Sequence, residues 1–370
     1  MATIKEVARR AGVAVGTVSH LLTGAASVSP ERRQRILDVM RELNYQPNDI
    51  ARSLKLSRTH MLGMVVADIT NPFFSQMVRG AEDAAMKHNY LLLTFNTDDQ
   101  VEREKKIVTV LRTRRVDGAL FVVAPSPDRP LHVADLIALG TPVVCLDRVP
   151  SGISVDSVTV DNKKAAQECV DHLLDLGHRH IAMLTGSLLL ETARDRLQGY
   201  RRAFERRSLP IDPDLICEGN FRTESGYELT RALLQRPHRP TAIFVSNGLM
   251  AIGVLRAIAQ ANLRCPQEIA VASFDDSDLS EVLNPPLTSV VQPAYEIGYR
   301  GVELLLERIQ LSKNPGKKVF RKLRLNTELR IRSSTEGSPP YTNGRDEKSR
   351  KSTKRLKRSA APGGKQRGTH

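Results

Sequence analysis

Between Met61 and Phe274 the chain alternates short apolar runs with longer amphipathic stretches, and this alternation limits the fold more than any other feature of the sequence. The predicted strands are 61–68, 90–95, 118–123, 142–146, 180–184, 215–218, 242–245 and 269–274. The predicted helices are 72–88, 101–114, 131–139, 163–176, 194–207, 225–235 and 249–260. Buried strands that alternate with helices form parallel sheets, because each parallel pair needs a crossover connection. We therefore predict an α/β core with two doubly wound parallel-sheet lobes.

The residues after Thr288 are expected to cross back between the two lobes. They carry a predicted helix at 293–311 and strands near 319–325 and 328–332. The core would span 61–335, with a first lobe of about 61–161 plus 290–325 and a second of about 162–289 plus 326–335. Ligands of open α/β sheets bind outside the carboxyl ends of the strands, so a shared cleft is expected there.

The stretch from Thr3 to Leu56 is expected to be helical. Thr3 and Glu6 have the spacing of a capping box, so a first helix should begin at Ile4, and Gly12 should end it. A second helix would run from about 15 to 22. Two short helices around a glycine turn are typical of a helix-turn-helix, whose second helix enters the major groove of DNA. A helical hairpin in an ordinary bundle has the same pattern.

A third helix should follow the Ser29-Pro30 start and close a three-helix headpiece over residues 1–46. The residues of this helix that we expect to face inward are Ile36, Leu37, Met40 and Leu43. They would pack against Val7, Val18 and Leu21 of the first two helices. Residues 47–60 would form a hinge helix and linker: Pro47 breaks the third helix, and Asn48 can cap about two turns that reach Leu56. So short a helix is marginal in water and would need a partner, whereas a plain interdomain linker would not.

Positive charge is concentrated at the two ends of the chain. Of 370 residues, 1–60 contain ten Lys/Arg and five Asp/Glu, and 337–370 contain ten and two, which leaves 35 and 34 for the body. A polyanionic partner would therefore contact the ends. The tail, 336–370, has almost no apolar residues and is expected to be disordered. Two interpretations of its charge are open: it adds non-specific affinity for DNA, or it is a solvated charge run.

Several classes of function find no support in the sequence. No P-loop, H-E-x-x-H, G-x-S-x-G or dinucleotide fingerprint is present, so we expect no enzyme and no cofactor. Four scattered cysteines without C-x-x-C spacing indicate neither disulfides nor a metal site. Since no signal peptide or membrane-spanning run is found, we expect a cytoplasmic protein without a membrane partner, and a periplasmic binding protein would leave the basic headpiece unexplained.

Several segments in the same order resemble the lactose-repressor (LacI/GalR) family of transcriptional regulators over about residues 2–335. They are Thr3–Ala8, Thr17–His20, Val28–Glu31, Tyr45–Asn48, Ala51–Lys55, Asp68–Phe74, Arg115–Gly118, Leu146–Arg148, Gly177–Ile181, Ser273–Asp276 and Asn284–Val290. The resemblance implies a homodimeric or homotetrameric repressor of double-stranded, near-palindromic operator DNA. Its periplasmic-binding-protein-like core would sense a small molecule.

The resemblance also implies which residues contact DNA. Val15 and His20 would read bases, Gly16 offers no side chain for readout, and the remaining headpiece candidates for phosphate or cap contacts are Thr3, Thr17, Ser19, Thr23 and Tyr45. Ala14 and His20 stand where many relatives carry serine and arginine, so readout by this helix should be modest. An exposed, solvated side chain is the alternative interpretation of His20. Hinge helices of two subunits would pair in the minor groove, with Leu54 as an apolar wedge beside Asn48, Arg52 and Lys55.

For the core, the resemblance implies an effector site built from strand ends and neighbouring loops. The candidates are Asn71, Phe73, Phe74, Asp147, Arg148, Thr192, Arg196, Phe221, Asn247, Asp275 and Gln292. Carboxylates, arginines and amides beside aromatic rings suit a sugar, which is favoured, and would also suit a nucleobase. A single Asp or Arg in such a set could instead form an interlobe salt bridge or cap a helix, and Gly248 departs from the aspartate of many relatives. The effector would change lobe closure and hinge pairing, as inducer or corepressor.

Overall fold

A computed structural model describes residues 2–23, 28–45, 58–311 and 319–336 of the chain. Its internal contacts divide the chain into two compact units, Met1–His60 with Arg115–Asp117 and Met61–Arg114 with Gly118–His370. The predictions for the hinge helix, including Asn48, Arg52, Leu54 and Lys55, lie outside the described residues. The same holds for the tail beyond Glu336.

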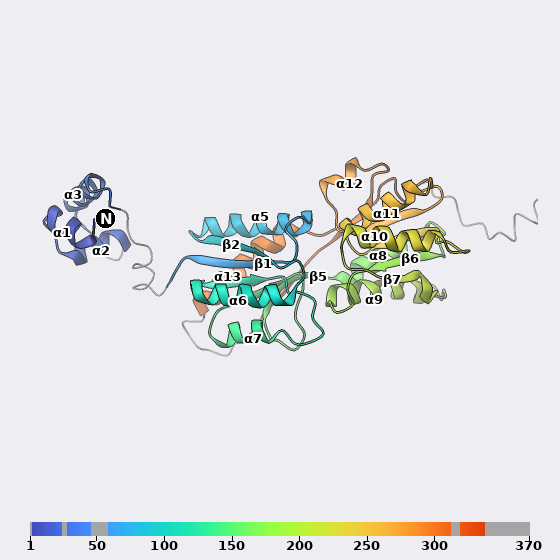
Figure 1. The fold of residues 1–370 in the computed structure, drawn as a ribbon, viewed down its shortest axis with the longest axis horizontal. Helices are drawn as coiled ribbons and strands as arrows, with labels where there is room; N and C mark the ends of the chain where they lie inside the picture. The colour runs from blue at the N-terminus through green and yellow to red at the C-terminus, as the bar shows by residue number, and fades with distance from the viewer. Residues whose placement is uncertain (1, 24–27, 46–57, 312–318, 337–370) are drawn as a thin grey trace, which may run out of the picture. The chain divides into compact units, whose positions relative to one another are not determined.

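The first unit contains a three-helix headpiece, formed by α1 (Ile4–Ala11), α2 (Val15–Thr23) and α3 (Pro30–Glu42) (Figure 1). Thr3 Oγ1 accepts a hydrogen bond from Glu6 N at 3.3 Å, and Gly12 ends α1 at a left-handed φ of 64°. The buried core consists of Val7, Ala8, Ala11, Val18, Ile36 and Val39. Leu37 was predicted to face inward, but Val39 takes that position because it follows Ile36 by three residues on the same helix face.

The first lobe of the second unit is a six-stranded sheet in the order β11-β5-β4-β3-β1-β2 with every pair parallel. Its strands are β1 (Met61–Val66), β2 (Leu91–Asn96), β3 (Gly118–Phe121), β4 (Val143–Leu146), β5 (Asp156–Val160) and β11 (Lys322–Leu325). Its helices are α5 (Pro72–Lys87), α6 (Val101–Arg114), α7 (Leu131–Ala138) and α13 (Ala294–Leu311). As Figure 1 shows, α5 and α13 cover one face and α6 and α7 the other.

The second lobe is a six-stranded sheet in the order β12-β10-β9-β8-β6-β7, parallel except for the β10–β12 pair. Its strands are β6 (Ile181–Thr185), β7 (Ile216–Glu218), β8 (Ala242–Val245), β9 (Ala270–Phe274), β10 (Thr288–Val291) and β12 (Glu328–Arg330). Its helices are α8 (Asn162–Asp175), α9 (Glu191–Glu205), α10 (Thr223–Leu234), α11 (Gly248–Gln260) and α12 (Asp278–Val282), with a 3-10 turn at Pro213–Leu215. Helices α8 and α9 bury one face and α10 and α11 the other.

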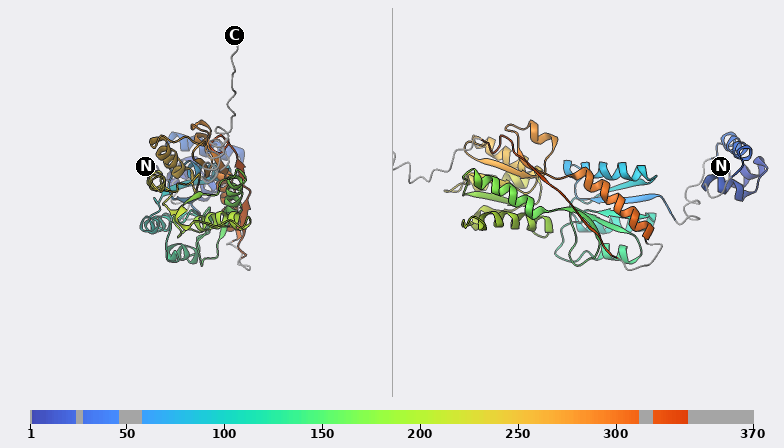
Figure 2. Two further views of the ribbon diagram at one scale, coloured as in Figure 1. Left: turned by 90° about the vertical axis from the view of Figure 1, so that its right-hand side faces the viewer. Right: turned by 180° about the vertical axis from the view of Figure 1, so that it is seen from behind.

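Three segments of chain connect the lobes. The right-hand view of Figure 2 shows α13, in orange, in front of the first sheet, where the second connection returns. They lie between β5 and α8, between β10 and α13, and between β11 and β12. The prediction that the crossing begins at Thr288 was wrong: residues 288–291 pair with β9 and β12, so the expected lobe boundary at 289/290 falls inside β10.

Two other element boundaries differ from prediction. Helix α9 begins at Glu191 rather than Arg194, because buried Thr192 and Ala193 extend the apolar face of Leu197 by one turn toward the N-terminus. Strand β11 begins at Lys322 rather than near Val319, which is 69% exposed. In the described part of the chain, no helix is both long and apolar enough to cross a lipid bilayer.

Candidate functional site

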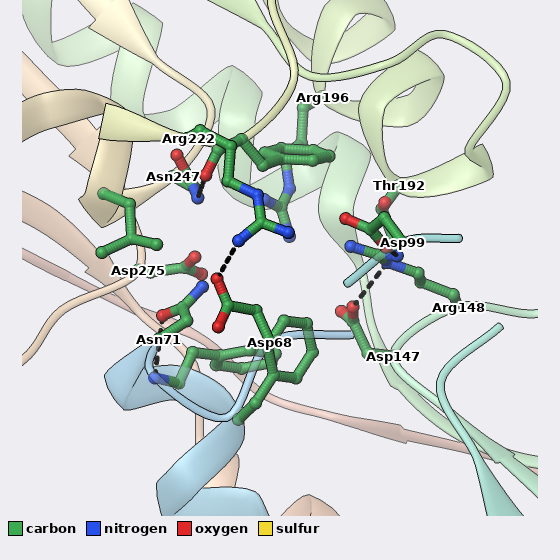
Figure 3. Close-up of a pocket in the computed structure, with 14 residues that line it drawn as sticks. Asp68, Asn71, Asp99, Asp147, Arg148, Thr192, Arg196, Arg222, Asn247 and Asp275 are labelled. Atoms are coloured by element: carbon green, nitrogen blue, oxygen red, sulfur yellow. Dashed lines mark hydrogen bonds and ion pairs between the residues drawn. The ribbon is translucent and has the colours of Figure 1, made fainter. Parts of the chain in front are cut away.

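A cavity with about 30 Å³ of free volume lies between the two lobes, at the carboxyl ends of both sheets (Figure 3). Ten of the eleven sequence-predicted effector residues line it: Asn71, Phe73, Phe74, Asp147, Arg148, Thr192, Arg196, Phe221, Asn247 and Asp275. The free volume is on the scale of a single water molecule. A larger ligand therefore requires the lining side chains or the lobes to move.

The eleventh predicted residue, Gln292, lies behind this lining. Its Nε2 donates to Asp275 Oδ1 at 2.6 Å, and its side chain is buried. Gln292 follows β10, next to a connection between the lobes. It orients Asp275 rather than lining the cavity.

Three lining residues adopt a left-handed backbone conformation that non-glycine residues rarely use. The φ angles are 59° at Asp147, 63° at Phe221 and 67° at Asp275. Each such residue costs about 1–3 kcal/mol, and this kind of strain gathers at ligand sites. These left-handed residues follow the ends of β4, β7 and β9, and their side chains line the cavity.

Arg196 brings a buried positive charge to the site. Its Nε donates to Asn162 Oδ1 at 2.8 Å, its Nη1 donates to the Ser246 carbonyl at 2.5 Å, and its guanidinium stacks on the ring of Phe274 with the centroid 3.7 Å away. The pKa of Arg196 is lowered by burial, an effect that Asp275 and Asp147 oppose. Its partners are a carbonyl and an amide at hydrogen-bond distance, so its remaining N–H groups can serve a ligand.

Asp147 and Asp275 are buried carboxylates beside Arg196. Burial raises the pKa of Asp147 to about 6, while the nearby Arg196 and Arg148 oppose that shift. Burial also raises the pKa of Asp275, which Arg196 opposes. Asp147 Oδ1 has no hydrogen-bond partner among the described residues, and the same is true of Ser246 Oγ and Gln292 Oε1. Buried polar atoms without partners are rare in folded proteins. Of these three residues only Asp147 lines the cavity, and its unpaired Oδ1 indicates a polar ligand there.

Arg148 joins the charged and aromatic parts of the site. Its Nη1 donates to Asp99 Oδ1 at 2.5 Å and to the Val123 carbonyl at 3.3 Å. Its guanidinium lies 5.7 Å from the ring centroid of Phe74 and 5.9 Å from that of Phe221. Both distances are within the range of cation–π attraction.

The two asparagines have structural roles as well as cavity positions. Asn71 Oδ1 caps α5 by accepting from Phe73 N at 3.1 Å, and Asn247 Oδ1 caps α11 by accepting from Met250 N at 3.0 Å. Asn247 Nδ2 also donates to the Phe221 carbonyl at 3.0 Å, which fixes the left-handed residue. An ideal Cβ on the neighbouring Gly248 would lie 3.5 Å from the Asp275 carbonyl oxygen, an ordinary van der Waals contact.

Sequence reasoning missed four lining residues: Asp68, Asp99, Arg222 and Leu249. Asp68 and Asp99 follow β1 and β2, so the rule of strand carboxyl ends would have found both. Arg222 follows the already predicted Phe221 and forms an ion pair with Asp68 across the two lobes. Leu249 lies in the first turn of α11 and carries no signal that separates it from a core leucine.

Five of the predicted DNA-contact residues, Val15, Gly16, Thr17, Ser19 and His20, lie within the first six residues of α2. Val15 is 41% exposed, Gly16 and His20 are exposed, and Thr17 and Ser19 are half-buried. Thr3 is exposed at the α1 cap, whereas Tyr45 packs against the headpiece core. Thr23 is the last residue of α2. Val15, Gly16 and His20 thus form an accessible surface at one end of the second helix.

Within residues 2–23, 28–45, 58–311 and 319–336, no group of three or more His, Cys, Asp or Glu side chains could hold a metal ion. All four cysteines are free, and burial raises the pKa of each thiol.

Known proteins match both parts of the chain. The model for "Bacterial regulatory proteins, lacI family" matches residues 3–48, and that for "Periplasmic binding protein-like domain" matches residues 170–335. The ribose operon repressor of Escherichia coli K12 is 37% identical, with 84% of this chain and 93% of that protein aligned. The HTH-type transcriptional repressor PurR of Photobacterium profundum is 34% identical, over 91% of this chain and 99% of that protein.

Among solved structures, the lac repressor dimer bound to operator and the anti-inducer ONPF superimposes with a TM-score of 0.78 at 29% identity, covering 90% of this chain and 99% of that one. The relatives named here are repressors and not enzymes. The chain therefore belongs to the lacI family of bacterial regulatory proteins, and it is a DNA-binding transcriptional repressor with an effector-binding domain.

Proposed function

We propose that this repressor binds a near-palindromic operator as a homodimer and that a small neutral sugar, bound between the two lobes, sets its affinity for the operator. The observation that carries the sugar is the unpaired Asp147 Oδ1 in the cavity lining, beside the buried Arg196. Asp147 Oδ1 can accept a hydrogen bond, and Arg196 can donate one. A sugar hydroxyl both donates and accepts, so one ring can satisfy all of these groups.

The size of the site and the relatives favour an aldopentose. Little free volume is present, so a compact ligand requires the least rearrangement. The relative with 37% identity is named a ribose operon repressor. We infer a pentose of the ribose type, with Phe73, Phe74 or Phe221 against its apolar ring face.

A nucleobase is the second candidate, because PurR of Photobacterium profundum is also similar and because Phe74, Thr192 and Asp275 line the cavity. A stacked base needs a free aromatic face. The guanidinium of Arg148 lies over both Phe74 and Phe221 and competes for those faces. A pentose can be held by hydrogen bonds alone, so the loss of these two ring faces disfavours a base more than a sugar.

Isothermal titration calorimetry separates the two classes of ligand. We expect D-ribose or another aldopentose to bind and adenine, guanine and hypoxanthine to give no heat. Arg196→Met should abolish the heat of sugar binding, because it removes the buried donor. The core of this variant should remain folded. Binding of a purine but of none of the pentoses would refute the sugar assignment.

For the DNA end, we propose that Val15 and His20 contact base edges, and that Thr3, Thr17, Ser19, Thr23 and Tyr45 contact the DNA backbone. The hinge candidates Asn48, Arg52, Leu54 and Lys55 remain proposals for the minor groove.

An operator selected from random DNA by the full-length protein should be near-palindromic, since two symmetric subunits read two half-sites. Selection of a single asymmetric half-site would argue against the dimer.

Coupling between the two ends requires that effector and operator affect each other's affinity. The affinity of the selected operator, measured by fluorescence anisotropy with and without the pentose, should differ by at least about fivefold. A decrease would make the pentose an inducer and an increase would make it a corepressor. Identical affinities at saturating, calorimetrically confirmed pentose would contradict the coupling.

A further inference from the structure

An ion pair joins the two lobes across the effector cavity. Asp68 follows β1 of the first lobe, and Arg222 immediately precedes α10 of the second. Arg222 Nη1 donates to Asp68 Oδ2, and Figure 3 shows the arginine side chain extending across the cavity to that carboxylate. Both residues line the cavity. Closing the lobes brings these opposite charges together, and opening them must separate the charges.

Both partners are held in place by their own lobes. Asp68 Oδ1 accepts from Thr70 N at 3.0 Å and from Thr70 Oγ1 at 2.6 Å, which leaves Oδ2 directed at the arginine. On the other side, Arg222 N donates to Asn220 Oδ1 at 3.1 Å. Little conformational freedom of the backbone is therefore lost when the pair forms.

The position of this pair is unusual among the ion pairs of the described residues. The others lie within the headpiece or within one lobe, or, for Arg324 and Asp161, beside a connection between the lobes. The side chain of Asp68 is 10% exposed and that of Arg222 is 36% exposed. Partial burial strengthens the attraction relative to a surface pair, while the exposure of the arginine leaves it sensitive to salt.

We propose that Asp68 and Arg222 form a latch that holds the lobes closed without help from the effector and controls access to the cavity. Because the cavity has free volume on the scale of one water molecule and Arg222 extends across it, we expect the latch to break when a ligand enters or leaves. The two residues act as positioning residues: they set the equilibrium between open and closed lobes and the exchange rate of the effector. This latch rests on the proposed effector site but not on the chemical class of the effector.

The latch can be tested without any ligand, because the chain contains no tryptophan. Leu189 is 47% exposed and lies in a second cavity between the lobes, of about 390 Å³, opposite Pro150 and Ser151 of the first lobe. A Leu189→Trp background therefore gives one fluorophore whose exposure to acrylamide increases as the lobes open. Quenching is measured for the latch variants Asp68→Asn, Arg222→Gln and their double variant, at low and high NaCl.

We expect each single variant to shift the lobes toward the open state by about fivefold and to remove most of the salt dependence of quenching. Asp68→Asn keeps an acceptor for Thr70, so its effect reports the charge. The double variant should equal the single ones, because either substitution already breaks the pair. Arg231→Gln, which removes an exposed pair with Glu228 on the same helix α10, should behave like the background. Unchanged quenching in the single variants, or effects that add in the double variant, would overturn the latch.

A second measurement uses D-ribose as the probe in stopped-flow binding. Arg222→Gln should raise both the association and the dissociation rate of D-ribose, which a direct ligand contact would not do, since losing a contact raises dissociation alone. If D-ribose binds no variant, the pentose assignment fails and the quenching data still decide the latch. If D-ribose binds and only its dissociation rate changes, Arg222 is a ligand contact and the latch is refuted.

Discussion

The chemistry of the proposed effector site depends most on Asp147, because it is a buried carboxylate with one oxygen left unpaired. Burial raises its pKa to about 6, so in the free protein the carboxyl is partly protonated below neutral pH. A ligand that donates a hydroxyl to Oδ1 favours the ionised form. The proton should therefore leave when the ligand binds.

We predict that effector affinity rises as the pH is raised from about 5 to about 7 and then levels off, since above the pKa no proton has to be released. Calorimetry in two buffers of different ionisation enthalpy measures the proton release directly. Asp147→Asn should bind more weakly and lose the pH dependence. An unchanged pH profile in that variant would assign the titration to another group.

His178 gives a second pH dependence, in stability rather than in binding. It is 4% exposed, its Nδ1 lies 2.9 Å from Thr241 Oγ1, and Nε2 has no hydrogen-bond partner among the described residues. Burial lowers its pKa to about 4, below the value near 6.5 of an unfolded chain. The folded state thus holds the neutral ring, and unfolding takes up a proton at acidic pH.

The contribution of His178 is fully present above about pH 6.5 and is lost as the pH falls toward 4, by up to about 3 kcal/mol. Urea unfolding at about pH 7.5 and about pH 5 should show a smaller loss of stability in His178→Gln than in the wild type. His88→Gln, at an exposed histidine that ends α5, should lose as much as the wild type. Equal losses in all three proteins would mean that His178 does not titrate in this range.

Sequence reasoning located most single residues of the cavity but not how they pair. Asn71, Asp147 and Asp275 could be assigned because each follows a strand, and parallel strands end together. That Asp68 pairs with Arg222 depends on how two separately folded sheets approach, across 154 positions of sequence. No local sequence pattern encodes how the two sheets approach each other, so the ion pair could be found in the structure and not in the sequence.

At the scale of elements, the tightest helix contact is between α5 and α13. An ideal Cβ on Gly80 would lie 1.9 Å from the Tyr295 carbonyl oxygen, and one on Gly298 would lie 1.9 Å from that of Met77. The two glycines thus let the backbones of these helices touch. Because the obstacle is backbone, a new side chain cannot be relieved by a change of rotamer.

We predict that Gly80→Ala lowers the free energy of unfolding of the core by about 3 kcal/mol despite the better helix propensity of alanine. Urea unfolding followed by circular dichroism measures the change. Gly16→Ala is the matched control, because Gly16 is also helical but has no atom within 4 Å of its Cβ position. It should leave the transition of the core unchanged. A loss below about 1 kcal/mol for Gly80→Ala would show that the helices can separate cheaply.

The elements that sequence reasoning missed are the short ones that depend on partners. Strand β5 (Asp156–Val160) begins with a carboxylate, which is buried because Arg308 neutralises it through Nε at 2.6 Å and Nη2 at 2.8 Å. Strand β10 contains buried Thr288 and Ser289, whose hydroxyls bond to Leu287, Arg332 and Asp276. Polar residues at these positions hide the apolar signal of a buried strand. The long helices and apolar strands were predicted because their periodicity is local.

For the whole molecule, the sequence predicted the order of a basic headpiece and a two-lobed core, and the family assignment agrees with it. Residues 46–57, which include most of the predicted hinge, lie outside the described part. Within the first unit, Asp117 Oδ1 accepts from Thr59 N at 2.8 Å and Oδ2 accepts from His60 N at 3.1 Å. The last residues of the predicted hinge and linker (47–60) are therefore tied to Arg115–Asp117, which also belongs to that unit.

The distribution of charge along the chain leads to a prediction about DNA binding by the whole protein. Residues 337–370 carry ten Lys/Arg and two Asp/Glu. Each phosphate neutralised by a protein contributes about 0.9 to the slope of log affinity against log salt. We expect deletion of 337–370 to flatten this slope by several units and to weaken binding to random DNA as much as to the operator, because phosphate contacts carry no sequence information. A full-length variant with the tail Lys/Arg replaced by Gln controls for chain length and should match the deletion. If both variants keep the wild-type slope, the tail is a solvated charge run, and the headpiece with its hinge supplies the electrostatic part of operator binding.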